Sequence, residues 1–128
     1  MRRIAEAADS ESPRAERART SAEILRAARD YRWVGIYDVG DDEISLLAHT
    51  GAPPARSRFP LTEGLSGEAV RTRDTVTSGS KIIVPVLGAE SGIVIGTLDV
   101  ESDRVGAFSD EDVSFLEACA AVLRPLYD

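Results

Sequence analysis

Two short runs of strand-forming residues flank a turn signal in the first half of the chain, and together they predict a β-hairpin. The runs are Trp33–Val39 and Glu43–His49, and Gly40-Asp41-Asp42 lies between them. β-Branched and aromatic residues favour strands, while glycine and aspartate favour the tight turn that joins antiparallel neighbours. Thr50–Pro54 then breaks the pattern, so the hairpin is expected to end there.

The strand pattern resumes in the second half. Thr75–Thr77 is predicted as a short extended piece, followed by buried strands at Ile82–Leu87 and Ile93–Glu101. Gly88–Gly92 supplies the turn between the two longer strands. Pro85 has no backbone N–H to give to a neighbouring strand, so it indicates a sheet edge or a bulge.

Helices are predicted at both ends of this strand region. Arg14–Asp30 is amphipathic, with Pro13 near its N-terminus and a stripe of small apolar residues, Ala18, Ala22, Leu25 and Ala28. A shorter helix is expected over Glu68–Arg73, after the turn-forming Gly64–Gly67.

The C-terminal helix has the clearest start signal, because Ser109 and Asp112 match a capping box. Two adjacent apolar stripes follow at helical spacing: Val113, Leu116, Ala120, Leu123 and Tyr127 form one, and Phe115, Cys119, Val122 and Leu126 the other. Together they are wider than a helix needs to cover a sheet, which predicts a second packing surface on another protomer. The expected partner is therefore a second copy of the chain, bound through the N- and C-terminal helices.

The chain has 128 residues, 43% of them hydrophobic and 29% charged, as expected of one globular domain. Residues 1–13 are expected to be a flexible leader, either loose or a separate short helix, because Pro13 disfavours helix at Ser12. Residues 14–128 then form a single α+β domain with a mostly antiparallel sheet of about five to six strands.

Charge and cysteine content exclude several classes of partner and site. The net charge of −7 argues against a nucleic acid partner, and no apolar run is long enough to span a membrane, so the chain is expected to be cytoplasmic. Its single cysteine, Cys119, allows no internal disulfide and is expected to fill the core. With one histidine as well, neither a metal site nor a cofactor is expected.

Five ordered segments from about residue 14 to the C-terminus resemble a GAF domain. They are Trp33–Tyr37, Gly64–Ala69, Ile82–Val86, Gly96–Ser102 and Phe108–Asp112. The resemblance implies a central sheet with the N- and C-terminal helices packed on one face.

Within that superfamily the chain is most similar to the free methionine-(R)-sulfoxide reductases, whose sheet holds a free amino acid. The resemblance implies that Trp33 and Tyr37 face the ligand from the first strand. Asp99 and Glu101 match the two acids that hold the ammonium group of the substrate, although Glu101 replaces a shorter aspartate.

Other positions depart from the family pattern. Ser66 stands where the reductases have a cysteine, and Lys81 stands where they have a glutamate. A loop that carries another cysteine is missing between Val76 and Ser80. Sulfoxide reduction of this kind needs one thiolate to attack sulfur and a second thiol to resolve the product, so these changes remove the expected chemistry.

The predicted function is therefore a non-catalytic GAF module, a small-molecule sensor or dimerising signalling domain, with no catalytic residue. Its expected ligand-binding residues are Trp33, Tyr37, Ser66, Lys81, Asp99 and Glu101. The alternative is an oxidoreductase that acts on free methionine-(R)-sulfoxide or a related small molecule, for which Ser66, His49 and Asp99 are the only polar set. Lys81, the only lysine, is expected either to pair with Asp99 or Glu101 in place of the substrate ammonium, or to extend into solvent at a strand edge.

Overall fold

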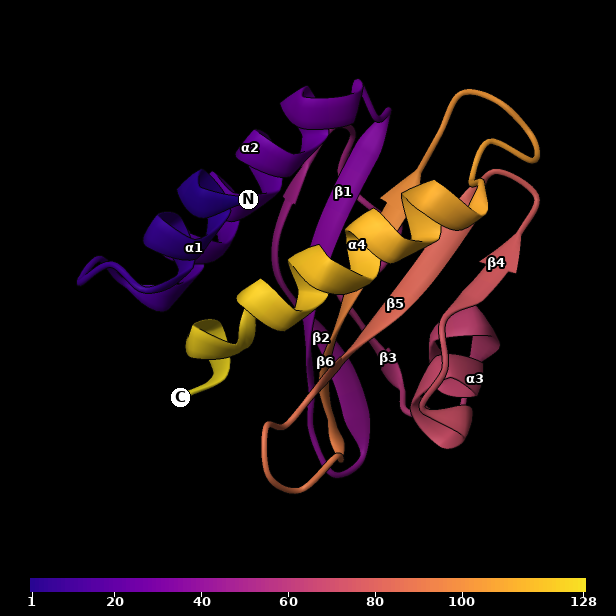
Figure 1. Ribbon diagram of the computed structural model, residues 1–128. Coiled ribbons are helices and arrows are strands. Elements are labelled where there is room, and N and C mark those ends of the chain that lie inside the picture. The colour runs from indigo at the N-terminus through magenta and orange to yellow at the C-terminus, as the bar shows by residue number, and fades with distance from the viewer.

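In the computed structural model, which describes residues 1–128, the predicted hairpin forms two adjacent strands of a single sheet (Figure 1). Strand β1 spans Trp33–Val39 and β2 spans Glu43–Thr50. The other strands are β3 (Arg58–Pro60), β4 (Val76–Ser78), β5 (Lys81–Leu87) and β6 (Val94–Glu101). All pairs are antiparallel, in the order β3-β2-β1-β6-β5-β4, so the predicted sheet is confirmed with six strands.

Pro85 lies in β5, at a position with an unpaired edge, one residue before an irregularity in the strand pairing. Strand β4 pairs only with residues 81–83 of β5, so the outer side of β5 is unpaired at Pro85. The pairing of β5 with β6 is irregular between Val86 and Leu87. The missing N–H of Pro85 therefore leaves the sheet intact.

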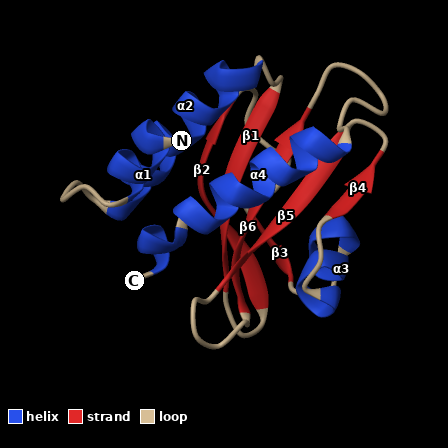
Figure 2. Ribbon diagram, viewed as in Figure 1, coloured by secondary structure: helices blue, strands red, loops and turns tan.

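One face of the sheet is covered by α2 (Arg14–Arg29) and α4 (Asp110–Val122), and α1 (Arg2–Ala8) packs against these two helices, as Figures 1 and 2 show. Side chains of β1, β5 and β6 on this face, among them Val34, Val84 and Leu98, form the main core with Leu25 and Leu116. The predicted packing of the N- and C-terminal helices on one face is confirmed.

The leader contains a short helix, α1, which is one of the two alternatives expected for it. Ile4 and Ala8 of α1 are buried in the main core, and the Arg17 guanidinium donates a 2.7 Å hydrogen bond to the Ala8 carbonyl. In α2, Ala18, Ala22 and Leu25 are buried as predicted. Ala28, the last member of the predicted stripe, is exposed instead.

Helix α4 begins with the predicted capping box, in which the Ser109 hydroxyl accepts from Asp112 N–H and the Asp112 carboxylate accepts from Ser109 N–H. The α-helix ends at Val122, and Leu126 and Tyr127 belong to a 3₁₀ turn, η1 (Arg124–Tyr127). Pro125 cannot continue an α-helix, so the apolar stripes are shorter than predicted. Phe115, on the outer stripe, is covered within the chain by the Arg29 guanidinium, 4.2 Å from its ring centroid.

The opposite face carries only α3 (Gly64–Thr72), which packs Ala69 against Ile83 of β5. This helix begins four residues before the predicted Glu68, so Gly64–Gly67 is its first turn rather than a preceding loop. Gly67 is required there because a Cβ would lie 2.6 Å from the backbone carbon of Thr62. The short α3 leaves much of this face uncovered.

Candidate functional site

The register of the three central strands arranges the predicted site residues in rows across the uncovered face. Because side chains alternate along a strand, residues two apart share a face, and directly paired residues are neighbours. The rows are Trp33–Glu101–Lys81, Gly35–Asp99–Ile83 and Tyr37–Thr97–Pro85. The even spacing that predicted a shared face for Trp33 with Tyr37, and for Asp99 with Glu101, is confirmed.

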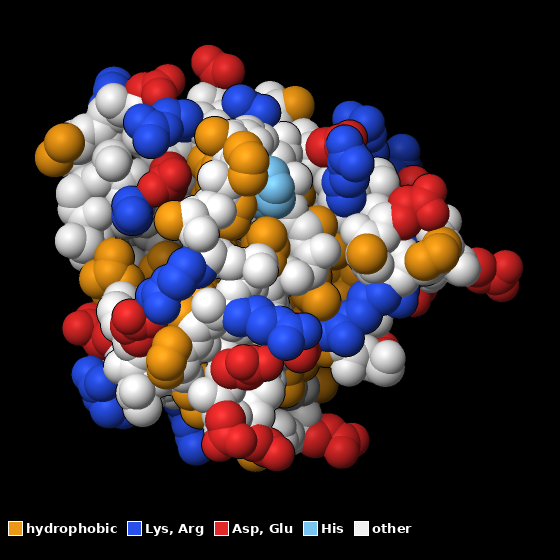
Figure 3. Space-filling model, turned by 180° about the vertical axis from the view of Figure 1, so that it is seen from behind, with side chains coloured by type: hydrophobic (Ala, Val, Ile, Leu, Met, Phe, Trp, Pro, Cys, Tyr) orange, Lys and Arg blue, Asp and Glu red, His pale blue; other side chains and the backbone are white.

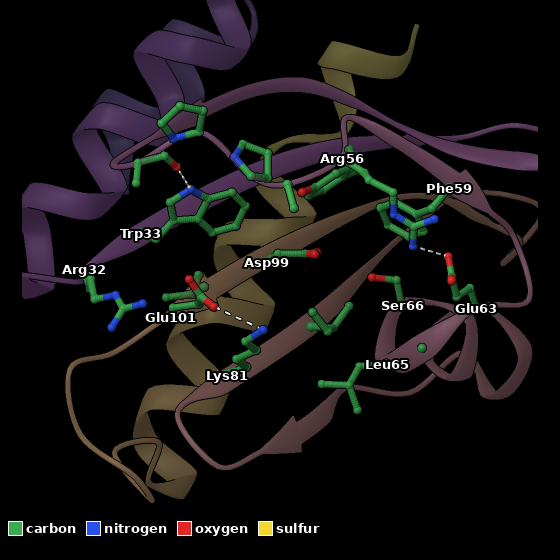
Figure 4. Close-up of a pocket in the computed structure, with 18 residues that line it drawn as sticks. Arg32, Trp33, Arg56, Phe59, Glu63, Leu65, Ser66, Lys81, Asp99 and Glu101 are labelled. Carbon is green, nitrogen blue, oxygen red and sulfur yellow. Dashed lines mark hydrogen bonds and ion pairs between the residues drawn. The ribbon is translucent and has the colours of Figure 1, made fainter.

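Residues of these rows line a cavity of about 510 Å³, a usual size for a small-molecule site. Figure 3 shows this face of the molecule, and Figure 4 shows the cavity lining. All six predicted ligand-binding residues line the cavity: Trp33, Tyr37, Ser66, Lys81, Asp99 and Glu101. The structure thus brings them together, and their role in binding remains a prediction.

The Trp33 indole is held in place by two contacts. Its ring folds over Gly35, where a Cβ would lie only 2.7 Å from the indole Cζ3. Its Nε1 donates a 2.8 Å hydrogen bond to the Ala52 carbonyl in the loop between β2 and β3. A buried indole N–H needs an acceptor, so the loop and the ring fix each other.

Aromatic residues continue the apolar wall. The Tyr37 ring lies 6.5 Å from Trp33 and 5.8 Å from Phe59, between ring centroids. Phe59 lies in β3, which the sequence did not predict as a strand. This wall offers an apolar surface for the body of a ligand.

Several lining residues were missed by the sequence analysis, namely Arg32, residues 52–56, Phe59 and Glu63. Arg56 and Glu63 form an ion pair that connects the β2–β3 loop to the start of α3. The one sequence signal for this loop was the need of the Trp33 N–H for an acceptor. Nothing in the pattern indicated which carbonyl would supply it.

Of the two arrangements expected for Lys81, the structure contains the ion pair, with Glu101 as its partner. Its Nζ lies 3.3 Å from Glu101 Oε1, in the row that also contains Trp33 (Figure 4). The Lys81 side chain is 55% exposed and the Glu101 side chain 23% exposed, so the pair lies at the wall of the cavity, open to solvent. The structure therefore contains the ion pair rather than a lysine that extends alone into solvent.

Asp99 is the buried acid of the site, 8% exposed, and its carboxyl points into the cavity (Figure 4). Burial raises the pKa of Asp99 to about 7, while the hydroxyls of Thr97 and Ser66 partly oppose this effect. Its Oδ1 is buried and has no hydrogen-bond partner. Such an atom can accept from a ligand when Asp99 is ionised, and the protonated carboxyl can donate.

Ser66 lies in the first turn of α3, and its side chain points into the cavity toward Asp99 (Figure 4). His49, the third member of the alternative polar set, is not among the lining residues. It stacks on Trp33 with 6.3 Å between ring centroids. The structure therefore brings Ser66 and Asp99 together without His49.

Cys119 is fully buried on α4, in the main core on the helical side of the sheet. Burial raises the pKa of its thiol to about 11. The predicted role as a core residue is confirmed. The sheet separates this thiol from the cavity.

We expect Cys119 to resist alkylation in the folded protein. A buried thiol with a raised pKa has almost no thiolate at pH 8, and the thiolate is the reactive form. Iodoacetamide should leave the native protein unmodified, by intact mass, over a time in which the urea-unfolded protein reacts completely. Complete labelling of the native protein at the unfolded rate would contradict this burial.

Two further structural findings concern metals and membranes. No group of three or more histidine, cysteine, aspartate or glutamate side chains is arranged to hold a metal ion. None of the helices combines the length and apolar character needed to cross a bilayer.

No family model matches the chain, but comparison with individual known proteins finds similar ones. Free methionine-R-sulfoxide reductase of Escherichia coli (strain K12) is 31% identical over 122 residues, covering 83% of this chain and 72% of that protein. The free methionine-R-sulfoxide reductase of Neisseria meningitidis, solved in complex with its substrate, is 27% identical with a TM-score of 0.82, covering 97% of this chain and 83% of that one.

A protein of Burkholderia vietnamiensis proposed to be a GAF sensor is 30% identical with a TM-score of 0.80, covering 94% of this chain and 83% of that one. The relatives thus include both reductases and a proposed sensor on one fold. The sheet order, the helical layer and the identity to the Escherichia coli protein lead to one conclusion: the chain belongs to the free methionine-R-sulfoxide reductase family of GAF domain proteins.

Proposed function

We propose that this protein is a non-catalytic member of its family, a GAF module that binds a small molecule in the cavity between the sheet and α3. The observation that carries the proposal is the placement of Ser66 and Cys119. Ser66 is at the cavity where the sequence resemblance puts a reactive cysteine, and the only thiol is buried beneath the opposite face.

The chemistry of sulfoxide reduction explains why this placement matters. A thiol takes the oxygen of the sulfoxide, which leaves a sulfide and a sulfenic acid on the enzyme. A second thiol then condenses with the sulfenic acid, releasing water and forming a disulfide. A serine hydroxyl cannot be oxidised in this way, and Cys119 cannot reach the cavity without unfolding of the core.

Binding, by contrast, is supported by features that the cavity retains. Trp33 is fixed by Gly35 and Ala52, and Asp99 presents an unpartnered oxygen at the floor. A buried carboxyl oxygen without a hydrogen-bond partner costs stability, so a ligand that donates to Asp99 Oδ1 accounts for its presence. A metabolite sensor is therefore the signalling role that fits this site.

The catalytic part of the proposal is tested with free methionine-(R)-sulfoxide and dithiothreitol, by chromatography of free methionine. We expect no methionine above the protein-free control, while the Escherichia coli reductase serves as the positive control. Catalytic turnover would reject the non-catalytic assignment and favour the oxidoreductase alternative.

The binding part is tested by thermal unfolding and by Trp33 fluorescence across a panel of metabolites. A ligand at a hundred times its Kd should stabilise the protein by about 2.7 kcal/mol. Because Trp33 is the only tryptophan and lines the cavity, a saturable change in its emission localises the ligand. A panel that changes neither signal would contradict the sensor role.

Dimerisation through the N- and C-terminal helices is a separate part of the proposal. Its support is the partly exposed apolar set on α4, which includes Val113 and Val122. Light scattering should give twice the monomer mass of 13.7 kDa. A single monomeric species at high concentration would reject it.

A further inference from the structure

We infer that Lys81 replaces the cationic group of a ligand, so that the cavity selects a small carboxylate with an apolar body and no amino group. This inference rests on the proposed binding function and names the class of ligand. It comes from the way in which the charged side chains around the cavity pair with one another.

The cavity is lined by six charged side chains, four of which are already paired. Lys81 pairs with Glu101 at 3.3 Å, and Arg56 pairs with Glu63. Arg32 belongs to no ion pair, and Asp99 is the only acid left without a cation. The unpaired charges at the site are therefore one guanidinium and one carboxyl.

These two remaining groups favour an anion over a cation. The Asp99 carboxyl is buried, so its ionised form is disfavoured, and the protonated form can donate a hydrogen bond to a carboxylate. With Asp99 neutral, the lining carries three positive and two negative charges. An incoming ammonium group would lie beside Lys81, whereas an incoming carboxylate would have the Arg32 guanidinium available.

The position of Lys81 decides where each part of the ligand lies. In Figure 4 Arg32, Glu101 and Lys81 lie together at the Trp33 end, and Phe59 and Ser66 lie at the other end. The carboxylate is thus placed near Arg32 and Lys81. The apolar body of the ligand extends over Trp33 and Tyr37 toward Phe59. The rings of these three residues line the cavity.

A matched pair of ligands tests this inference, because 3-phenylpropanoate is phenylalanine without its amino group. Both are titrated at pH 6, below the Asp99 pKa of about 7, with Trp33 emission and thermal unfolding as readouts. We expect 3-phenylpropanoate to bind at least tenfold more tightly than L-phenylalanine to the wild-type protein.

Variants of Lys81 then assign the preference to this residue. Lys81→Glu leaves Glu101 without its cation and adds a second acid, so it should lower the preference for the amine-free acid at least tenfold. Lys81→Arg keeps the charge and should keep the preference. Arg71→Glu makes the same change in charge on an exposed position of α3 outside the cavity lining, and should behave as the wild type.

Each outcome separates this inference from the proposed function. Equal binding of the two acids, tighter binding of phenylalanine, or an unchanged preference in Lys81→Glu would overturn the inference while leaving a binding module. Binding of neither acid would also overturn it, and the metabolite panel then decides the proposed function independently. Because Lys81 is more than half exposed, these variants should unfold near the wild-type temperature without ligand, which the same melts check.

Discussion

Asp99→Asn should make the protein more stable at alkaline pH and change the way its stability depends on pH. In the folded protein burial raises the pKa of Asp99 to about 7, from an ordinary value of 3.8. The folded state thus holds this proton more tightly than the unfolded state. The favourable contribution is complete below about pH 4 and is lost as pH rises through 7.

At 1.36 kcal/mol for each pKa unit, the wild type should lose roughly 3 kcal/mol relative to Asp99→Asn between pH 5 and pH 8. Urea unfolding of both proteins at each pH measures this difference, and the titration of the other carboxyls cancels in the comparison. Asp103→Asn, at an exposed loop position, is the matched control and should follow the wild type. Parallel pH curves for wild type and Asp99→Asn would contradict the assigned pKa.

Gly96→Ala should destabilise the fold by about 2–5 kcal/mol, although it adds a single methyl group. Gly96 pairs with Asp38 in β1 and Val86 in β5, and the Tyr127 ring lies directly over it. A Cβ there would overlap the Tyr127 ring, with 2.5 Å to Cε1. Moving the ring would also break the 2.6 Å hydrogen bond that Tyr127 Oη donates to the Tyr37 carbonyl.

A double-mutant cycle separates this clash from a general intolerance of alanine in β6. In Tyr127→Ala the space above Gly96 is empty, so adding Gly96→Ala should cost less than 1 kcal/mol by urea unfolding. Gly40→Ala is the control, because its Cβ would meet only the Glu43 carbonyl oxygen at 3.4 Å. Strictly additive losses at Gly96 and Tyr127 would exclude the clash as the cause.

The positions of site residues were predictable where they depend only on the alternation of side chains along one strand. Even spacing on a strand placed Trp33 with Tyr37 and Asp99 with Glu101, because alternation holds for any strand whatever its neighbours. The likeness to the reductases placed Ser66 and Lys81 beside the same cavity. The sequence left open whether Lys81 pairs with Asp99 or Glu101 or extends into solvent, and the structure contains the pair with Glu101.

The remaining parts of the site were not predictable, because they come from loops and helix ends whose positions depend on the whole fold. The Ala52 carbonyl that accepts from Trp33, and the Arg56–Glu63 pair, join segments with no periodic pattern. The start of α3 at Gly64 was also missed, since glycine is a poor helix former and the close approach of Gly67 to Thr62 is visible only in the folded chain. Helix α4 ends before Pro125, although the helical spacing of Leu126 and Tyr127 had predicted a longer helix.

The sequence alone determined the order and type of the main elements, the shared faces of the strand residues, and the absence of a second thiol. These follow from local periodicity and from composition, which no packing can change. Only the tertiary structure decided that Asp99 is buried with its Oδ1 unpartnered and that Cys119 lies on the far side of the sheet from Ser66. The burial of a side chain and its distance from another depend on which distant segments pack around it. A local sequence pattern therefore cannot predict them.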